Sequence, residues 1–258
     1  MTTPKTHIAT SDATSITIRG KSLVDDLIGR RSFTEMVYWL TVGREPGPRE
    51  TAVLDACLVT LMEHGFTPSA LIARITADSV PEQIQVPMAA GLLAIGSVFV
   101  GTMEGTAQLL AEGIDTPDSE AWARDTAALY LDAKRPLPGF GHPHHRPDDP
   151  RTPRLFAVAR EAGVDGRYIA LLETLAAAVD AHARRHLTIN ATGAIGALLL
   201  EIGVPVDVMR AMAVISRCGG LAGHIVEEHA TKSARTIWRA AEAAVPYVGK
   251  IAEPNASP

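Results

Sequence analysis

The chain has 258 residues, of which 47% are hydrophobic and 21% charged, and its formal net charge is −5 at pH 7. This is the composition of a globular protein and excludes a disordered or fibrous chain; the acidic balance also argues against a non-specific nucleic-acid binder. Two cysteines, Cys57 and Cys218, are too few for a disulfide framework and too far apart for a metal knuckle.

Abundant alanine, few aromatic residues and short β-branched runs favour closely packed helices, and the hydrophobic periodicity predicts helix after helix with almost no strand. Ser22 is a candidate N-cap, Ser32 and Glu35 form a candidate capping box, and Gly43 ends the helix that they begin. The expected helices cover residues 22–29, 32–43, 49–62, 68–77, 87–101, 106–112, 119–133, 154–162, 168–185, 193–202, 206–216, 219–229 and 235–244.

Residues 83–103 carry no charged side chain and are about as long as a membrane span. They include two glutamines, a proline and three glycines, and no second candidate span accompanies them, so we interpret them as a buried or subunit-interface helix over 87–101. A helix without charge needs covering on all sides, which predicts a homodimer or a higher homo-oligomer. The expected location is the cytoplasm, because the first fifteen residues lack the apolar core of a signal peptide.

The composition changes in residues 134–153, which read KRPLPGFGHPHHRPDDPRTP and leave no room for a helix. Long ordered loops in compact domains are usually functional. One interpretation is a rigid loop that presents a histidine and several cations to an anionic ligand. The other is a solvated proline-rich connector whose histidines have no role. Composition alone does not separate the two.

Several separated segments, taken together, resemble the citrate synthase superfamily, and most closely its short form, the citryl-CoA lyase module found alone or at the end of ATP-citrate lyase. They occur in the family's order from about Thr17 to Glu228. They are IRGKSLVDDLIGRRSFTEMVYWLTVGREP from Ile18, LMEHG from Leu61, GFGHPHHRPDDPR from Gly139, NATGAIG from Asn190 with EIGVP after it, and SRCGGLAGHIVEE from Ser216.

The resemblance implies an all-α, two-lobed subunit in an obligate dimer, in which a small lobe closes over the ligand. The large, dimer-forming domain is expected at residues 1–66 and 191–258, and the small lobe at 67–190. Coenzyme A is expected against the loop at 134–153, with Gly139, Phe140, Gly141 and Arg146 as its binding residues. No metal, membrane or nucleic acid is expected as a partner.

The resemblance also implies individual roles. His64 matches the histidine that hydrogen-bonds the thioester oxygen and stabilises the enol of the acyl-CoA. His142 matches the histidine that exchanges a proton with the hydroxyl of the citryl group. Arg151 and Arg217 match arginines that bind substrate carboxylates. Imidazole suits both proton tasks because its ordinary pKa lies near physiological pH, and the planar guanidinium fits carboxylates.

One position departs from the family pattern. The family's third catalytic group is an aspartate two residues after the asparagine of the fourth motif, and Thr192 stands there. Losing a positioned proton donor or acceptor typically costs a factor of ~100 to 10,000. Three explanations are open: another acid (Asp180, Glu63 or Glu227) substitutes, the reaction runs only as cleavage or decarboxylation with a water held by Thr192, or the protein binds a CoA ester without turning it over.

The sequence therefore predicts a CoA-dependent carbon–carbon lyase of the citryl-CoA lyase type, with His64, His142 and Thr192 at the catalytic positions. It would cleave a 3-hydroxy-3-carboxyacyl-CoA to an acyl-CoA and a 2-oxo acid. The alternative is a non-catalytic or divergent CoA-ester binding protein, or a related decarboxylase or hydrolase. Condensation of the citrate synthase type is less expected, because it must deprotonate the acetyl methyl group.

Overall fold

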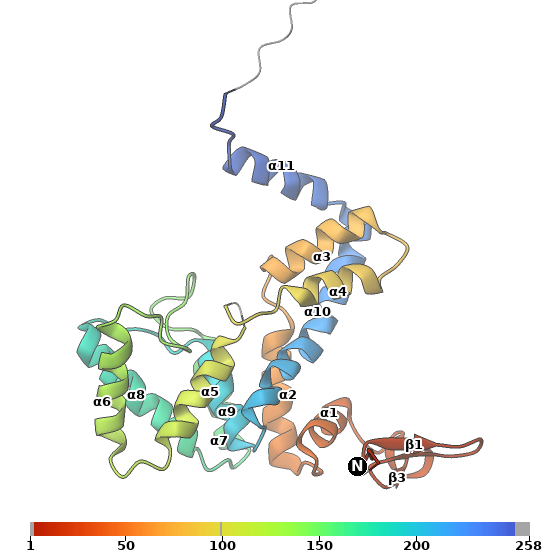
Figure 1. Ribbon diagram of the computed structural model, residues 1–258, viewed down its shortest axis with the longest axis horizontal. Coiled ribbons are helices and arrows are strands. Elements are labelled where there is room, and N and C mark those ends of the chain that lie inside the picture. Colours follow the sequence, from red (N-terminus) through yellow and green to blue (C-terminus); the bar gives the residue numbers. More distant parts are fainter. Residues whose placement is uncertain (1–2, 99, 251–258) are drawn as a thin grey trace, which may run out of the picture. The chain divides into compact units, whose positions relative to one another are not determined.

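The computed structural model describes residues 3–98 and 100–250, and these are predominantly helical (Figure 1), which confirms the expected all-α class. The helices are α1 (Phe33–Val42), α2 (Pro48–Met62), α3 (Pro68–Ser79), α4 (Gln85–Leu93), α5 (Thr102–Gly113), α6 (Ser119–Leu131), α7 (Arg151–Glu161), α8 (Arg167–Ala183), α9 (Ala191–Glu201), α10 (Met209–Thr231) and α11 (Ala234–Ala244). A π-helical turn η1 (Leu23–Leu27) and a 3-10 turn η2 (Val206–Val208) complete the helical elements of the described residues.

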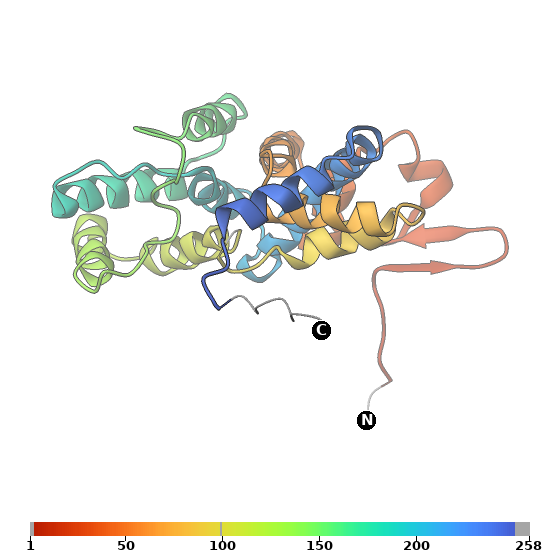
Figure 2. The same ribbon diagram turned by 90° about the horizontal axis from the view of Figure 1, so that it is seen from above.

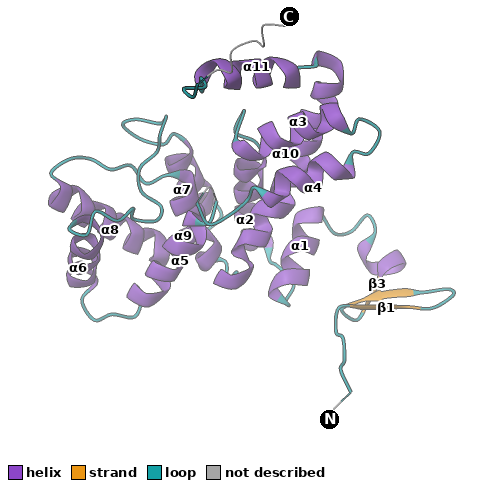
Figure 3. Cartoon of the chain, turned by 45° about the horizontal axis from the view of Figure 1, so that its top comes forward, coloured by secondary structure: helices purple, strands orange, loops and turns teal. Residues whose placement is uncertain are grey.

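A small antiparallel sheet near the N-terminus was not expected from the sequence (Figure 3). Its strands are β1 (Ala9–Ser11), β2 (Ile16–Ile18) and β3 (Lys21–Ser22), in the order β1-β2-β3. The strands are only two or three residues long, and the residues of β1 are exposed. They are therefore too short to show the alternation of hydrophobic and polar residues by which a strand is recognised in a sequence.

The predicted caps of the first helices are present. Ser32 Oγ accepts from the Glu35 N–H while the Glu35 carboxylate accepts from the Ser32 N–H, which is the expected capping box. Gly43 ends α1 with a φ of 90°. Ser22 also caps as expected, accepting from the Asp25 N–H, but the element it begins is the single turn η1.

Several helix boundaries were wrong. The helix α7 begins at Arg151, inside the stretch 134–153 that was expected to hold no helix, and α5 begins at Thr102 rather than at 106. The uncharged helix expected over 87–101 ends at Leu93, and the Gly101 N–H donates to the Gly96 carbonyl at 2.9 Å. A Cβ on Gly101 would lie 2.4 Å from the Ser97 Cα, so this turn requires glycine at position 101. The separate helices expected over 206–216 and 219–229 form the one helix α10, since the Gly219–Gly220 pair stays helical inside a longer packed element. No helix of the described residues is long and apolar enough to cross a membrane.

The chain forms two compact units, and α10 contributes residues to both. The first unit comprises the chain up to Glu63 together with Ile95–Arg217. Its main core lies around α9, whose residues Ala191 to Leu199 are almost all buried. A Cβ on Gly196 would lie 2.6 Å from the Met103 carbonyl oxygen, so this glycine permits the close packing of α9 against α5 (Figure 1).

The second unit comprises His64–Ala94 and the chain from Cys218 onward. Here α3 and α4 lie side by side (Figure 2), and a small core of Ala73, Ala77, Leu221 and Ile225 joins α3 to α10. The expected lobes have different boundaries from these contact-defined units. The expected lobes were defined by dimer formation and by closure over a ligand, which the division into two compact units does not test. The assignment of residues to these lobes therefore stays a prediction.

Candidate functional site

The loop between α6 and α7 is held by hydrogen bonds to the segment that precedes α9. The Gly141 N–H donates to the Thr188 carbonyl at 2.8 Å, and the Asn190 N–H donates to the Gly139 carbonyl at 2.9 Å. Phe140 and Ile189 form an antiparallel bridge between these two bonds. The proline-rich loop is therefore anchored to the core of the first unit at its glycine-rich part, as a ligand-presenting loop requires.

Gly139 and Gly193 make a close approach between the loop and the first turn of α9. Gly139 has a φ of +84°, and a Cβ on it would meet Thr106 Oγ1 and lie 2.9 Å from the Gly193 Cα. A Cβ on Gly193 would lie 2.6 Å from the Gly139 carbonyl oxygen. Both positions require the absence of a side chain.

Gly139→Ala is expected to destabilise the protein by about 2–4 kcal/mol, from left-handed backbone strain plus the steric conflict. The matched control is Gly20→Ala, because Gly20 has a φ of +86° with no heavy atom within 4 Å of its Cβ position. The control carries only the backbone strain, about 1–2 kcal/mol. Urea denaturation of both variants checks this, and equal losses would show that the loop–α9 contact is not tight.

Backbone hydrogen bonds favour one tautomer of His142. Its Nδ1 accepts from the His144 N–H at 3.1 Å and from the His145 N–H at 3.0 Å, so a neutral ring carries its proton on Nε2. The His145 ring stacks on it with centroids 4.3 Å apart, and Arg151 Nη2 lies 3.5 Å from Nε2. His142 thus presents an N–H group beside a guanidinium, an arrangement suited to a substrate oxygen next to a carboxylate.

Asp149 joins the loop to two helix N-termini. Its side chain is fully buried; Oδ2 accepts from the Ala191 N–H at 2.9 Å at the start of α9, and Oδ1 accepts from the Arg151 N–H at 3.1 Å at the start of α7. Arg151 Nη2 and Nε also donate to the carboxylate at 2.8 and 2.9 Å. Burial raises the pKa of Asp149, but these hydrogen bonds and the Arg151 charge outweigh it and lower the pKa to about 2.

Thr192 belongs to a chain of hydroxyl groups at the start of α9. Its Oγ1 donates to Asn190 Oδ1 at 2.7 Å, and because that oxygen can only accept, the 2.7 Å contact with Thr102 must have Thr102 as the donor. Asn190 Oδ1 also accepts from the Gly193 N–H as the N-cap of α9. The Thr192 hydroxyl proton is therefore committed to a capping interaction.

A pocket of about 310 Å³ lies on the loop and the segment after α8. Of the expected site residues, Gly141, His142 and Arg146 line it, and Arg185 and His186 complete its basic wall. His186 hydrogen-bonds Asp180 at 2.6 Å and Asp148 at 2.9 Å, which raises its pKa. The cations around this pocket suit an anionic group such as a phosphate.

The remaining expected residues lie at the junctions of the two units along the chain. His64 is an exposed residue of the second unit, in the loop that follows α2. Arg217 ends the first unit, and its side chain is 11% exposed, with Glu63 Oε2 at 3.7 Å from Nη1. Burial lowers the pKa of Arg217, opposed by the Glu63 charge. Within the described residues, Arg217 Nη1 has no hydrogen-bond partner, so its N–H groups can donate to a carboxylate ligand.

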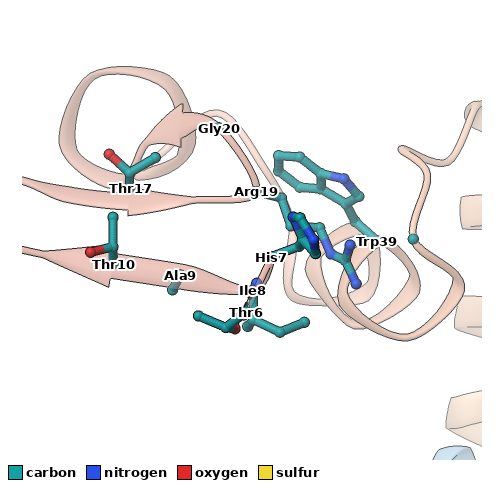
Figure 4. A pocket seen from close by; sticks show the side chains of 10 residues that line it. Thr6, His7, Ile8, Ala9, Thr10, Thr17, Arg19, Gly20 and Trp39 are labelled. Atoms are coloured by element: carbon teal, nitrogen blue, oxygen red, sulfur yellow. Dashed lines mark hydrogen bonds between the residues drawn. The ribbon is translucent and has the colours of Figure 1, made fainter. Parts of the chain in front are cut away.

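A larger pocket, about 620 Å³, lies beside the N-terminal sheet, where His7, Arg19 and Trp39 point toward one another (Figure 4). Arg19 Nη2 donates to the Leu40 carbonyl at 3.0 Å near the end of α1. This contact satisfies an end-of-helix carbonyl, which is a structural role. None of the expected site residues lines this pocket.

Comparison with known proteins defines the family. Residues 13–241 match the family described as "Citrate synthase, C-terminal domain", and the chain belongs to this family. It is similar to the structure of citryl-CoA lyase from Hydrogenobacter thermophilus, with 33% identity, a TM-score of 0.86 and coverage of 97% of this chain and 96% of that one.

Two further relatives extend the comparison. The fold is shared with an aspartate-to-alanine mutant of Methanosaeta concilii ATP citrate lyase in complex with (3S)-citryl-CoA, at 19% identity and a TM-score of 0.80, over 97% of this chain and 42% of that one. The 2-methylcitrate synthase of Shewanella oneidensis is 27% identical over 208 residues, which are 79% of this chain and 52% of that protein. The chain thus spans about half the length of the curated relatives it matches.

Sequence reasoning did not assign roles to Asp149, Thr102 or His145. Asp149 was noticed only as part of the Asp-Pro-Arg ending of the loop motif. An acidic residue two positions before an arginine at a helix start is a signal for a capping carboxylate, and it could have been used. Thr102 carries no such signal, because its role depends on Thr192, which is ninety residues away along the chain. The stacking of His145 on His142 depends on the turn that the loop adopts.

Proposed function

We propose that this protein is a CoA-dependent carbon–carbon lyase that cleaves a citryl-like CoA thioester to an acyl-CoA and a 2-oxo acid. The observation that carries the proposal is the likeness to citryl-CoA lyase over nearly the full length of both chains. The curated relatives are citrate and methylcitrate synthases, which points to the same substrate class of CoA esters and carboxylates.

In the proposed reaction the bond between the carbinol carbon and the CH2 group of the thioester breaks. The hydroxyl proton passes to His142, the carbinol carbon becomes the carbonyl of the 2-oxo acid, and the electron pair forms the acyl-CoA enolate. His64 hydrogen-bonds the enolate oxygen, and Arg151 and Arg217 bind carboxylates. A proton then adds to the enolate carbon.

The tautomer of His142 bears on its role. With the proton on Nε2, the ring donates a hydrogen bond to the oxygen of the 2-oxo acid. To accept the alcohol proton it needs a lone pair at Nε2, which the Nδ1–H tautomer offers at the expense of both backbone hydrogen bonds. The Arg151 guanidinium near Nε2 favours a negatively charged substrate oxygen at that point.

The hydroxyl chain at Thr192 supports cleavage rather than condensation. Condensation requires a base that removes a proton from the acetyl methyl group, and the Thr192 hydroxyl is neutral with its proton committed to Asn190. Cleavage needs a proton source for the enolate, and a water held by the free lone pair of Thr192 provides one. The hydroxyl lone pair, rather than a carboxylate, then orients that water.

A CoA-ester binding protein without turnover is the second candidate, favoured by the absence of a carboxylate at position 192. Thr192→Asp separates the two. If the natural protein is a lyase built around the hydroxyl chain, the variant loses about 10- to 100-fold in kcat, because a charged carboxylate disrupts the cap of α9. Activity measured as release of 2-oxo acid from citryl-CoA checks this.

If the natural protein is inactive and the Thr192→Asp variant is active, the natural protein is instead a CoA-ester binding protein. Binding itself is measured separately: coenzyme A at a hundred times its dissociation constant is expected to stabilise the fold by ~2.7 kcal/mol. The proposal places coenzyme A at Gly139, Phe140, Gly141 and Arg146, and a homodimer in the cytoplasm as the working form. Light scattering checks the oligomeric state.

A further inference from the structure

The second unit contains a buried ion cluster that the sequence did not reveal. Arg74, on α3, is 1% exposed, and each of the three nitrogens of its guanidinium donates a hydrogen bond. Nε donates to His224 Nδ1 at 2.9 Å, Nη1 donates to Glu228 Oε2 at 3.1 Å, and Nη2 donates to Glu227. A buried cation of this kind is stable only because its hydrogen bonds and charges are satisfied together.

The acidic side of the cluster is equally well held. Glu228 is 1% exposed and accepts from the Ala234 N–H at 2.8 Å and from the Ser233 hydroxyl. Arg74 Nη1 also lies 3.2 Å from Ser233 Oγ. The cluster therefore joins α3, α10 and the start of α11, and Arg74 and Glu228 each lose several partners if they move.

The cluster reaches the loop that carries His64 through one aromatic ring. The guanidinium of Arg74 lies over the Phe66 ring, 5.0 Å from its centroid, and the His224 ring is 6.0 Å from the same ring. Phe66 is nonetheless 58% exposed, so these two contacts rather than burial in a core hold it. His64 stands two residues earlier, across Gly65, whose φ of +73° makes the turn.

The orientation of His224 is also determined by Arg74. Its Nδ1 accepts from the Arg74 Nε–H, so the neutral ring carries its proton on Nε2, and the imidazole cannot rotate without breaking this bond. The two rings and the guanidinium then form one packed group on which the turn at Gly65 rests. Removing this support is expected to increase the backbone motion of the turn.

We propose that Arg74 and Phe66 are positioning residues for His64, with the ion cluster of Arg74, His224, Glu227 and Glu228 as the fixed base and the Phe66 ring as the link to the loop. The catalytic part of this inference rests on the proposed lyase function. The structural part, that the Phe66 ring immobilises the loop, does not.

The test variant is Phe66→Ala, which removes the link and leaves the ion cluster intact. Phe66→Tyr keeps the ring and is the rescue. Phe33→Ala is the matched control, because Phe33 is also exposed, at 72%, and lies in the other unit. Removing Arg74 itself would leave the buried Glu228 carboxylate without its cation and risks unfolding the unit, so it is not the primary test.

Two measurements give separate outcomes. Backbone nitrogen-15 order parameters at His64 and Gly65 are expected near 0.85 in the natural protein, below about 0.6 in Phe66→Ala, and near 0.85 again in Phe66→Tyr. In the lyase assay, Phe66→Ala is expected to lower kcat about 10- to 100-fold while KM changes less than about threefold, because a misplaced catalytic group chiefly affects the transition state.

Unchanged order parameters in Phe66→Ala would overturn the inference, whatever the activity. An inactive natural protein whose order parameters respond as expected would overturn the lyase proposal but leave the positioning of the loop standing. Order parameters that respond while kcat stays within about twofold of the natural value would show that the fixed loop has no catalytic consequence, and would overturn the catalytic part.

Discussion

His142→Asn is expected to lower kcat for cleavage of citryl-CoA by about 100- to 10,000-fold, the usual cost of removing a positioned proton-transfer group. Asparagine is chosen because its carbonyl oxygen can accept from the N–H groups of His144 and His145, as Nδ1 does in the natural protein. The turn of the loop is then kept, and only the Nε2 position is lost. Steady-state kinetics of the purified variant measures the effect.

His182→Ala is the control for this variant. His182 lies on α8, where its Nε2 contacts Asp132 Oδ1 at 2.7 Å, and it has no place in the proposed site. The kcat of the His182→Ala variant is expected to stay within about twofold of the natural value. A decrease in kcat of less than about threefold in His142→Asn would show that His142 does not transfer a proton in the reaction.

Asp149→Asn is expected to destabilise the protein by about 2–4 kcal/mol, because it leaves Arg151 without its buried partner and weakens the bond to the Ala191 N–H. For a chain of this size the melting temperature is expected to fall by about 5–10 °C. Calorimetry checks it. Asp148→Asn is the matched control: Asp148 is the exposed neighbour whose carboxylate contacts His186, and a loss of at most about 1 kcal/mol is expected there.

The ionisation of Asp149 also makes the stability of the protein depend on pH. Because the pKa of Asp149 is lowered from 3.8 to about 2 in the folded state, its ionised form contributes about 2 kcal/mol at neutral pH. That contribution is present above pH ~4 and disappears as the pH falls toward 2. The stability difference between the natural protein and Asp149→Asn should therefore shrink over this acid range; a constant difference would show that the charge of Asp149 is not what stabilises the fold.

Local signals predicted much of the fold, because they depend on neighbours in the sequence. The capping box of Ser32 and Glu35 and the glycine stop at Gly43 are interactions over three or four residues, and both are present. Tertiary packing decided the rest. The described residues between Leu93 and Thr102 leave the helix although their composition is apolar, because the chain turns at Gly101, whereas Gly219–Gly220 continue a helix inside the longer packed element α10.

The candidate site was predictable only as far as motifs reach. The order of the histidine and arginine motifs indicated which segments matter. It could not show that Asp149 caps α9 some forty residues later, or that Thr102 donates to Thr192 across ninety residues, because these partners are distant along the chain. The Arg74 cluster was missed for the same reason: an arginine among alanines on a helix gives no sign of burial.

The most direct test of the lyase proposal is to incubate the protein with (3S)-citryl-CoA in heavy water and identify the products by mass spectrometry. Cleavage through an enolate predicts equal amounts of oxaloacetate and acetyl-CoA, with one deuterium in the acetyl methyl group, because the enolate carbon takes its proton from exchangeable groups. Citrate and free coenzyme A in place of these products would contradict the carbon–carbon lyase and indicate a thioester hydrolase, and unchanged citryl-CoA would leave a binding protein.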